Sequence, residues 1–335
     1  MTAHRIRIGL IGTGRIGQVH AASIASSSQF ELTYTADVFL AGAEKIAQLY
    51  GGKATEDPAE LLCSGEVDAV LIASPTPTHI DLIRKAIHFG LHVLCEKPID
   101  LDIALVDELR SQAAAANTVV ALGFNRRFDP NFSALRSRIE KGEIGKIEQL
   151  VIISRDPQPA PQDYIAVSGG IFRDMTIHDF DMARFFIPEI IEVSAMGSNS
   201  FCDYIKAEND YDNVAVTLRG SQEELVTIIN SRHASFGYDQ RIEAFGDKGM
   251  LVAGNVQTNT VRAYTADNVE ASDPFPNFFL ERYAEAYRLE LEEFGRSVLT
   301  GQSLNPTYED GRAALLLANA ALESATTGRA VKVNL

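Results

Sequence analysis

The sequence of 335 residues contains no tryptophan, only 3 cysteines, and no long apolar run. Cys63, Cys95 and Cys202 lie far apart, so they match neither a disulfide framework nor the paired spacing of a metal site. No stretch approaches the roughly 20 apolar residues that cross a bilayer, and we expect no membrane partner. Glycines break the first apolar run, which predicts a buried strand rather than a signal peptide. We therefore expect a cytoplasmic protein.

Basic residues are also scarce. The 30 Lys and Arg residues face 45 Asp and Glu residues, and the formal net charge is −15 at pH 7. A surface of this sign repels nucleic acids, so we expect none as a partner. The hydrophobic fraction of 46% is ordinary for a globular protein, and the length predicts two domains.

Strand and helix patterns alternate in the first part of the chain, which we assign to residues 1–123. The expected strands are 6–11, 30–36, 67–73, 92–95 and 119–124, and the expected helices are 16–26, 41–50, 78–89 and 101–116. Such alternation is typical of an α/β fold with a parallel, doubly wound sheet.

The pattern changes in the second part, residues 124–335, where few helices separate the strands. The expected strands are 147–154, 190–198, 213–218, 224–231, 241–245 and 250–253, followed by long helices over 279–299 and 308–326. The proline-rich segment 156–163 is expected to be a loop. This pattern predicts an α+β domain with a large, open, mainly antiparallel sheet.

The first expected strand runs into a glycine-rich turn, Gly12-Thr13-Gly14-Arg15-Ile16-Gly17. Gly12 permits the tight turn, Gly14 allows a diphosphate to approach the backbone, and Gly17 allows the helix to pack closely. Asp37 ends the second strand about 20 residues later, where a carboxylate accepts the adenosine ribose hydroxyls. The motif predicts NAD rather than NADP, because Asp37 would repel a 2′-phosphate. The alternative is a glycine turn without a ligand.

Two further loops follow strands at the same edge of this sheet, over the expected cofactor crevice. The first carries Ser74, Pro75, Thr76 and His79, which we predict to lie near the cofactor, although a capping or structural role is equally open. The second is Glu96-Lys97-Pro98, in which we predict that Glu96 and Lys97 lie near the cofactor. Lys97 can stabilise negative charge on a substrate oxygen, and Pro98 fixes the backbone that aims it. The alternative is a Glu96–Lys97 surface pair.

The most informative segment is 168–184, in which Asp174, His178 and Asp181 follow a Gly-Gly turn at i, i+4 and i+7 spacing. In a helix these side chains share one face. His178 can take and return a hydroxyl proton, Asp174 can orient it, and Asp181 can accept a substrate hydroxyl. A buried structural histidine is the alternative. No third His or Cys lies at ligand spacing, so we expect no metal.

The glycine turn, Glu96-Lys97-Pro98 and the Gly169-Gly170…Asp174…His178 segment resemble the Gfo/Idh/MocA oxidoreductase family over essentially the whole chain. Segments 123–129, 154–157 and 174–181 resemble its inositol dehydrogenases. The resemblance implies an N-terminal Rossmann domain and a C-terminal domain whose sheet builds oligomer interfaces. By position, Lys97, Asp174 and His178 match the catalytic residues. Arg126, Asp156, Asp181 and Tyr238, together with the catalytic residues, match substrate contacts. Ser154 and Phe236 replace a His and a Tyr found in some of these enzymes.

The resemblance implies NAD-dependent oxidation of myo-inositol to the 2-keto inosose, with His178 as the base and Lys97 at the reacting oxygen. It also implies a homotetramer or homodimer. One alternative is a dehydrogenase of another cyclitol or sugar. A non-catalytic NAD-binding sensor is a second alternative, but a sensor needs no proton relay such as Lys97, Asp174 and His178 provide.

Overall fold

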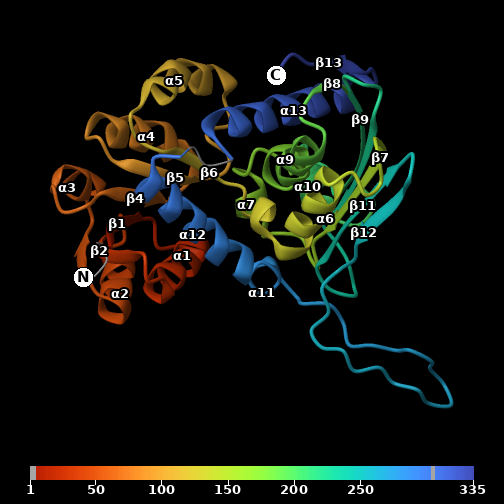
Figure 1. The fold of residues 1–335 in the computed structure, drawn as a ribbon, viewed down its shortest axis with the longest axis horizontal. Helices are drawn as coiled ribbons and strands as arrows, with labels where there is room; N and C mark the ends of the chain where they lie inside the picture. Colours follow the sequence, from red (N-terminus) through yellow and green to blue (C-terminus); the bar gives the residue numbers. More distant parts are fainter. Residues whose placement is uncertain (1–4, 303–305) are drawn as a thin grey trace. The chain divides into compact units, whose positions relative to one another are not determined.

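The computed structural model describes residues 5–302 and 306–335, drawn in Figure 1. The chain forms two compact units. The first comprises Met1–Phe128 and Glu285–Leu315, and the second comprises Asp129–Ala284 and Leu316–Leu335. The segment Glu285–Leu315, from the last part of the chain, groups with the first unit, and the domain boundary expected at residue 123 stays a prediction.

The first unit contains a six-stranded sheet with the order β3-β2-β1-β4-β5-β6. Its strands are β1 (Ile6–Ile11), β2 (Phe30–Ala36), β3 (Lys53–Thr55), β4 (Ala69–Ile72), β5 (His92–Glu96) and β6 (Val120–Gly123). All neighbouring pairs are parallel. The predicted doubly wound sheet is therefore confirmed, and only the three-residue β3 was not anticipated.

Helices connect these strands. They are α1 (Arg15–Ser26), α2 (Leu40–Tyr50), α3 (Pro58–Cys63), α4 (His79–His88) and α5 (Ile103–Ala115), with short 3₁₀ turns at Thr76–Thr78 and Asn125–Phe128. Side-chain caps fix where some helices begin. Asp57 accepts a hydrogen bond from the Ala59 amide at 2.8 Å, and Asp102 accepts one from the Ala104 amide at 2.9 Å. Each cap satisfies an amide that has no partner within its own helix.

A helix from late in the chain, α12 (Ala284–Thr300), completes the core of the first unit. Leu291 and Phe294 are buried in the same cluster as β1 and β2, and the rings of Phe30 and Phe294 stack 6.2 Å apart. A Cβ on Gly295 would lie 2.8 Å from the Phe30 ring, so glycine allows this close approach. The sequence predicted one helix over 279–299. Instead, α11 (Phe279–Arg282) ends at Tyr283, where ψ is 15°, and α12 follows.

The second unit contains a seven-stranded sheet with the order β12-β11-β7-β10-β9-β8-β13. Its strands are β7 (Ile147–Arg155), β8 (Ile190–Ser198), β9 (Asn213–Gly220), β10 (Leu225–Ser231), β11 (Asp239–Gly246), β12 (Gly249–Ala253) and β13 (Val331–Lys332). Neighbours pair antiparallel except β7 and β10, which are parallel. The prediction of a large, mainly antiparallel sheet is confirmed.

Helices gather on one face of this sheet (Figure 1), where α9 packs on β7 and β10, and α6 on β12. The helices of this unit are α6 (Pro130–Glu140), α7 (Gln162–Ile165), α8 (Ile171–Asp174), α9 (Thr176–Phe186), α10 (Asp203–Ala207), α11, and α13 (Tyr308–Thr327), which starts in the first unit. Helix α7 begins inside the segment predicted to be a loop, because Ile165 is buried and anchors a helical turn.

The opposite face of the second sheet carries exposed apolar side chains, including Met196 at 76% and Val252 at 57% exposure. A long arm, residues 254–278, extends away from the sheet (Figure 1), and Ala263 and Ala271 pair across it. Across residues 5–302 and 306–335, no helix combines the length and the apolar character that a membrane crossing requires.

Candidate active site

The glycine turn lies at the crevice where β1 and β4 are neighbours, between the two halves of the first sheet. Gly12 has a φ of +97°, and a Cβ there would lie 2.5 Å from the Ser74 amide nitrogen. A Cβ on Gly17 would lie 2.1 Å from the Gly12 carbonyl oxygen. Side chains are therefore excluded at both positions, as the sequence analysis expected for Gly12 and Gly17.

Gly14 differs from these two glycines because a Cβ there would meet nothing within 4 Å. It is the N-cap of α1, and within the described ranges no side chain caps this helix end. The space next to Gly14 is thus open, and the positive end of the helix dipole lies at this end of α1. This arrangement fits the diphosphate of a dinucleotide, which binds to such helix ends.

Asp37 is held beside the glycine turn by three hydrogen bonds. Its Oδ2 accepts from the Thr13 amide and hydroxyl, each at 2.7 Å, and its Oδ1 accepts from the Phe39 amide at 2.8 Å. Burial alone would raise the pKa of Asp37, but the bonds from Phe39 and Thr13 lower it below the ordinary value. The carboxylate is therefore an anion at neutral pH, as its predicted role at the ribose requires.

The Ser74–His79 loop follows β4 beside the glycine turn. The hydroxyls of Ser74 and Thr78 lie 2.6 Å apart, and Thr78 donates to the Pro75 carbonyl at 2.7 Å. The two ring nitrogens of buried His79 lie 2.8 Å from the carbonyl oxygens of Ser74 and Pro98. His79 thus joins this loop, which includes the predicted cofactor residues Ser74, Pro75 and Thr76, to the segment after Lys97. Its direct contact with the cofactor stays a prediction.

Glu96 ends β5 in a buried pair that the sequence analysis did not anticipate. Its Oε1 lies 2.8 Å from Nε2 of His20 on α1, and the two side chains are 11% and 1% exposed. Gly123 leaves room for the carboxyl group, since a Cβ there would lie 3.1 Å from Cδ of Glu96. The structure therefore contradicts a Glu96–Lys97 surface pair, and a contact of Glu96 with the cofactor stays a prediction. Lys97 follows directly, is partly exposed, and precedes a cis peptide bond to Pro98.

Arg126 lies in the 3₁₀ turn after β6 and is 4% exposed. Its neighbour Arg127 pairs with Asp310 at 3.1 Å within the first unit. The first unit thus carries the glycine turn, Asp37, the Ser74 loop, Lys97 and Arg126 after the carboxyl ends of successive parallel strands. That common edge is where this type of sheet binds ligands.

In the second unit, the segment around His178 forms two helices and not the one continuous helix that would place Asp174, His178 and Asp181 on a single face. Asp174 ends α8, Met175 intervenes with φ −98° and ψ −58°, and α9 begins at Thr176. The His178 amide donates to the Met175 carbonyl at 3.3 Å, so the chain continues in a tight helical turn. Asp174 and His178 are partly buried. Asp181 is completely buried, and its contact with a substrate stays a prediction.

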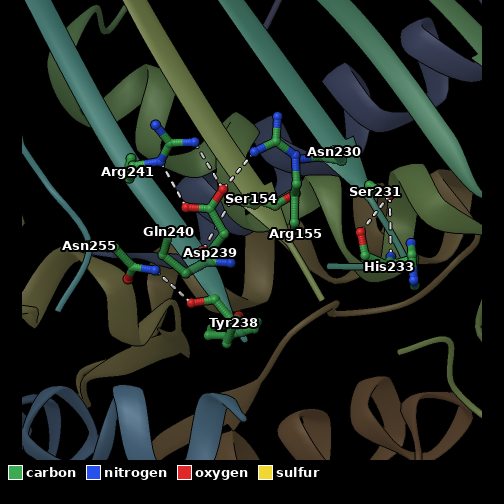
Figure 2. A network of polar contacts seen from close by, with 10 residues as sticks. All are labelled: Ser154, Arg155, Asn230, Ser231, His233, Tyr238, Asp239, Gln240, Arg241 and Asn255. Atoms are coloured by element: carbon green, nitrogen blue, oxygen red, sulfur yellow. Dashed lines mark hydrogen bonds and ion pairs between the residues drawn. The ribbon is translucent and has the colours of Figure 1, made fainter. Parts of the chain in front are cut away.

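The adjacent Asp179, which we did not predict, attaches α9 to the sheet. Its carboxylate accepts from the Ser154 hydroxyl on β7 at 2.6 Å and from the Asn230 amide on β10 at 2.8 Å. All three side chains are buried. Figure 2 shows Ser154 and Asn230 on their neighbouring strands. Ser154 therefore supports the helix that carries His178.

Asp156 and Tyr238 lie at one edge of the second sheet. Asp156 directly follows β7, and Tyr238 directly precedes β11, whose first residue Asp239 pairs with Arg155 at the end of β7. Buried Asp239 binds Arg155 at 2.6 Å and Arg241 at 2.8 Å (Figure 2). These ion pairs fix the backbone that carries Tyr238.

Tyr238 is 5% exposed, and its ring meets that of Tyr283 edge-on at 6.0 Å. Its carbonyl accepts from the Asn255 side chain at 2.8 Å (Figure 2). Phe236, by contrast, is 45% exposed and contacts the ring of Phe275 on the arm. Within the described residues, no group of three or more His, Cys, Asp or Glu side chains is placed to hold a metal ion.

Two family models match the chain. An oxidoreductase family described by an NAD-binding Rossmann fold matches residues 6–124, and a GFO/IDH/MocA C-terminal domain matches residues 132–252. The predicted NAD-binding domain is thereby confirmed, and the open helix end at Gly14 agrees with it.

Relatives of known name match over the full length. An inositol 2-dehydrogenase of Rhizobium meliloti is 43% identical, with 98% of this chain and 99% of the relative covered. The crystal structure of a myo-inositol dehydrogenase from Corynebacterium glutamicum has a TM-score of 0.96 and 55% identity, and covers 99% of this chain and 100% of that chain. A scyllo-inositol dehydrogenase from Lactobacillus casei, solved with NAD(H) and scyllo-inositol, has a TM-score of 0.91 and 31% identity over 98% of this chain and 99% of that one.

These matches confirm the family that the motifs indicated. Both units are covered, and the edge of the first sheet fits the cofactor that the family model names. The chain belongs to the Gfo/Idh/MocA family of NAD-binding oxidoreductases.

Proposed function

We propose that this protein is an NAD-dependent inositol 2-dehydrogenase that oxidises myo-inositol to the 2-keto inosose. The observation that carries the proposal is full-length similarity to enzymes named for this reaction, at 43% and 55% identity. The site residues support it, because Lys97, Asp174 and His178 are those an alcohol oxidation needs. A second candidate substrate is scyllo-inositol, which is bound in the solved relative at 31% identity.

NAD supplies the acceptor for the hydride that leaves the carbinol carbon. His178 takes the proton of the reacting hydroxyl, and Lys97 stabilises the negative charge that develops on its oxygen. Asp174 orients the His178 ring. Arg126, Asp156, Asp181 and Tyr238 bind the remaining hydroxyls of the ring.

We also propose that the protein is a homodimer or homotetramer that assembles through the helix-free face of the second sheet. Ile153 on β7 pairs with Ile229 on β10, and Met196 on β8 continues this face through its partner Ala215 on β9. Exposed apolar side chains gathered on one sheet face commonly mark a protein–protein interface. The cytoplasmic location and the domain limits given by the sequence analysis stay predictions.

A polyol panel assayed with NAD tests the catalytic proposal. Wild type should oxidise myo-inositol faster than hexoses, and Lys97→Met and His178→Ala should each reduce kcat by about 100-fold or more, the scale of a lost proton-transfer or oxyanion group. NAD affinity, measured by calorimetry, should change little. Turnover of hexoses but not of inositols would contradict the proposal that the substrate is an inositol. NAD binding without turnover of any polyol favours the sensor, and an active His178→Ala variant places the base elsewhere.

A further inference from the structure

The carboxylate of Asp174 is held by two groups that come from distant parts of the second unit. Its Oδ1 accepts a hydrogen bond from the Tyr164 hydroxyl on α7 at 2.8 Å. Its Oδ2 lies 3.3 Å from a guanidinium nitrogen of Arg232, which follows β10. Donors on both oxygens fix the plane of a carboxylate as well as its position, because each bond removes a rotation.

Arg232 is a buried cation placed between two carboxylates. Its side chain is 1% exposed, and its second terminal nitrogen lies 3.1 Å from Oδ2 of Asp210. Burial alone would lower the pKa of Arg232, but the charges of Asp174, Asp210 and Asp156 raise it above its ordinary value. A buried cation is strongly unfavourable without such partners. Arg232 therefore stays charged and cannot turn away from Asp174 without losing a partner.

Asp210 in turn anchors this cation to the start of α8. Its Oδ1 accepts from the Ile171 amide at 2.8 Å. Gly170 precedes Ile171 with a φ of +84°, and a Cβ there would lie 3.0 Å from the same oxygen. The Gly169-Gly170 turn before Asp174 thus has a physical reason, since it lets Asp210 approach the backbone that leads to Asp174.

Tyr164 acts from the other side. Burial, and then the charge and hydrogen bond of Asp174, raise the pKa of the Tyr164 hydroxyl above its usual range. The hydroxyl thus stays protonated at neutral pH and donates to Asp174. The hydroxyl end of Tyr164 is desolvated beside Asp174, but the residue as a whole is 47% exposed, so it contributes less to the core than a buried tyrosine does. The main polar interaction of Tyr164 is the hydrogen bond from its hydroxyl to Asp174.

We propose that Tyr164 and Arg232 are positioning residues that hold the Asp174 carboxylate in the orientation needed to direct His178. The inference rests on the proposed roles of Asp174 and His178. Neither residue touches the reacting atoms in this proposal, and both act through Asp174. Small displacements of a catalytic group can slow a reaction by up to about 100-fold, so the loss of one positioning bond should be visible in kcat.

A double-mutant cycle with NAD and the best polyol of the panel tests the proposal. Tyr164→Phe should lower kcat by about tenfold, the scale of a hydrogen bond to a charged group, while KM for NAD stays the same. In an Asp174→Ala background, the same substitution should cause no further loss. Tyr204→Phe is the matched control, because that hydroxyl donates to the Ala160 carbonyl at 2.8 Å and should leave kcat unchanged.

Arg232 is tested by a pair of variants, of which one keeps the positive charge and the other removes it. Arg232→Lys should retain part of kcat and Arg232→Met much less, while the unfolding temperature separates lost folding from lost turnover. An equal loss from Tyr164→Phe in both backgrounds, or no loss in wild type, overturns the inference while leaving the proposed function intact. Full activity of Asp174→Ala on every polyol instead refutes the role of Asp174, and the inference with it.

Discussion

Individual residues of the first unit are arranged so that charge is fixed before any ligand binds. Asp37 shows this most clearly. Hydrogen bonds from Thr13 and Phe39 fix both of its oxygens, yet a carboxylate has about four acceptor sites, so capacity remains for ribose hydroxyls. A 2′-phosphate would meet the same anion at short range, and this repulsion selects against NADP.

Replacing Asp37 tests this selection. Wild type should use NAD at least about tenfold more efficiently than NADP, equivalent to roughly 1.4 kcal/mol. Asp37→Ser should lower this ratio of the two efficiencies. The ratio of kcat/KM for the two cofactors measures it. Asp37→Glu keeps the charge and should retain most of the preference. Equal efficiencies in wild type would refute the role of Asp37.

The same carboxylate predicts how the preference depends on pH. The pKa of Asp37 lies below its ordinary value, so the group is charged at every pH above the normal range for aspartate. The NAD preference should therefore stay constant between about pH 7 and 8, where the 2′-phosphate of NADP is also almost fully ionised. It should weaken as this phosphate takes up a proton at about pH 6, and further only as acid protonates Asp37. Parallel titrations of NAD and NADP binding check this. A preference that changes steeply near neutral pH points to another group.

At the scale of elements, helix α12 decides where the first unit ends. Phe294 is fully buried and stacks on Phe30 of β2, although the two residues are far apart in the sequence. Burying a phenylalanine contributes about 1.5–3 kcal/mol by transfer from water, and its close packing adds to this. The helix is thus part of the fold of the cofactor domain.

Truncating this contact should destabilise the protein measurably. Phe294→Ala should lower the free energy of unfolding by about 3–5 kcal/mol, because it removes a buried ring and leaves a cavity. Leu299→Ala lies on the same helix but at a position that is 58% exposed, and should change stability by less than about 0.5 kcal/mol. Urea unfolding followed by circular dichroism compares the two. If Phe294→Ala and Leu299→Ala changed the free energy of unfolding by the same small amount, α12 would not be part of the core.

At the scale of the whole molecule, the helix-free face of the second sheet exposes apolar side chains among charged ones such as Glu243. Met196 and Val252 lie on this face with 76% and 57% of their surface exposed. Strand register places them on the same side. Successive pairings lead from Met196 through Ala215, Ile229 and Ile153 to Arg241, and Glu243, two residues after Arg241, pairs with Val252. A face of this kind buries a large area when two copies meet, which favours a symmetric dimer.

Light scattering tests the predicted assembly. Wild type should be a dimer or tetramer at micromolar concentration, and the double variant Met196→Glu/Val252→Glu should dissociate, because it buries charges without partners. Leu105→Glu changes a 41% exposed leucine on α5 of the first unit and should leave the mass unchanged. A monomeric wild type argues decisively against assembly through this face.

The sequence by itself determined the architecture and the chemical class. Local patterns carry this information: alternating apolar runs specify the parallel sheet, and Gly12 and Gly17 specify the turn because only a residue without a Cβ fits at those two positions. Family, fold class, NAD and oxidoreductase activity all followed from such patterns together with the resemblance, and the comparisons confirmed them.

Only the tertiary structure decided which residues support the site. His20 is paired with Glu96 over a sequence separation of 76 residues, and Arg232 with Asp174 over 58. No local pattern marks such pairs, because a buried polar residue looks like a surface one until its partner is known. The same holds for Phe294, whose helical periodicity predicts a buried face but not the sheet that buries it. Contacts between segments that are distant in the sequence determine which residue becomes the partner.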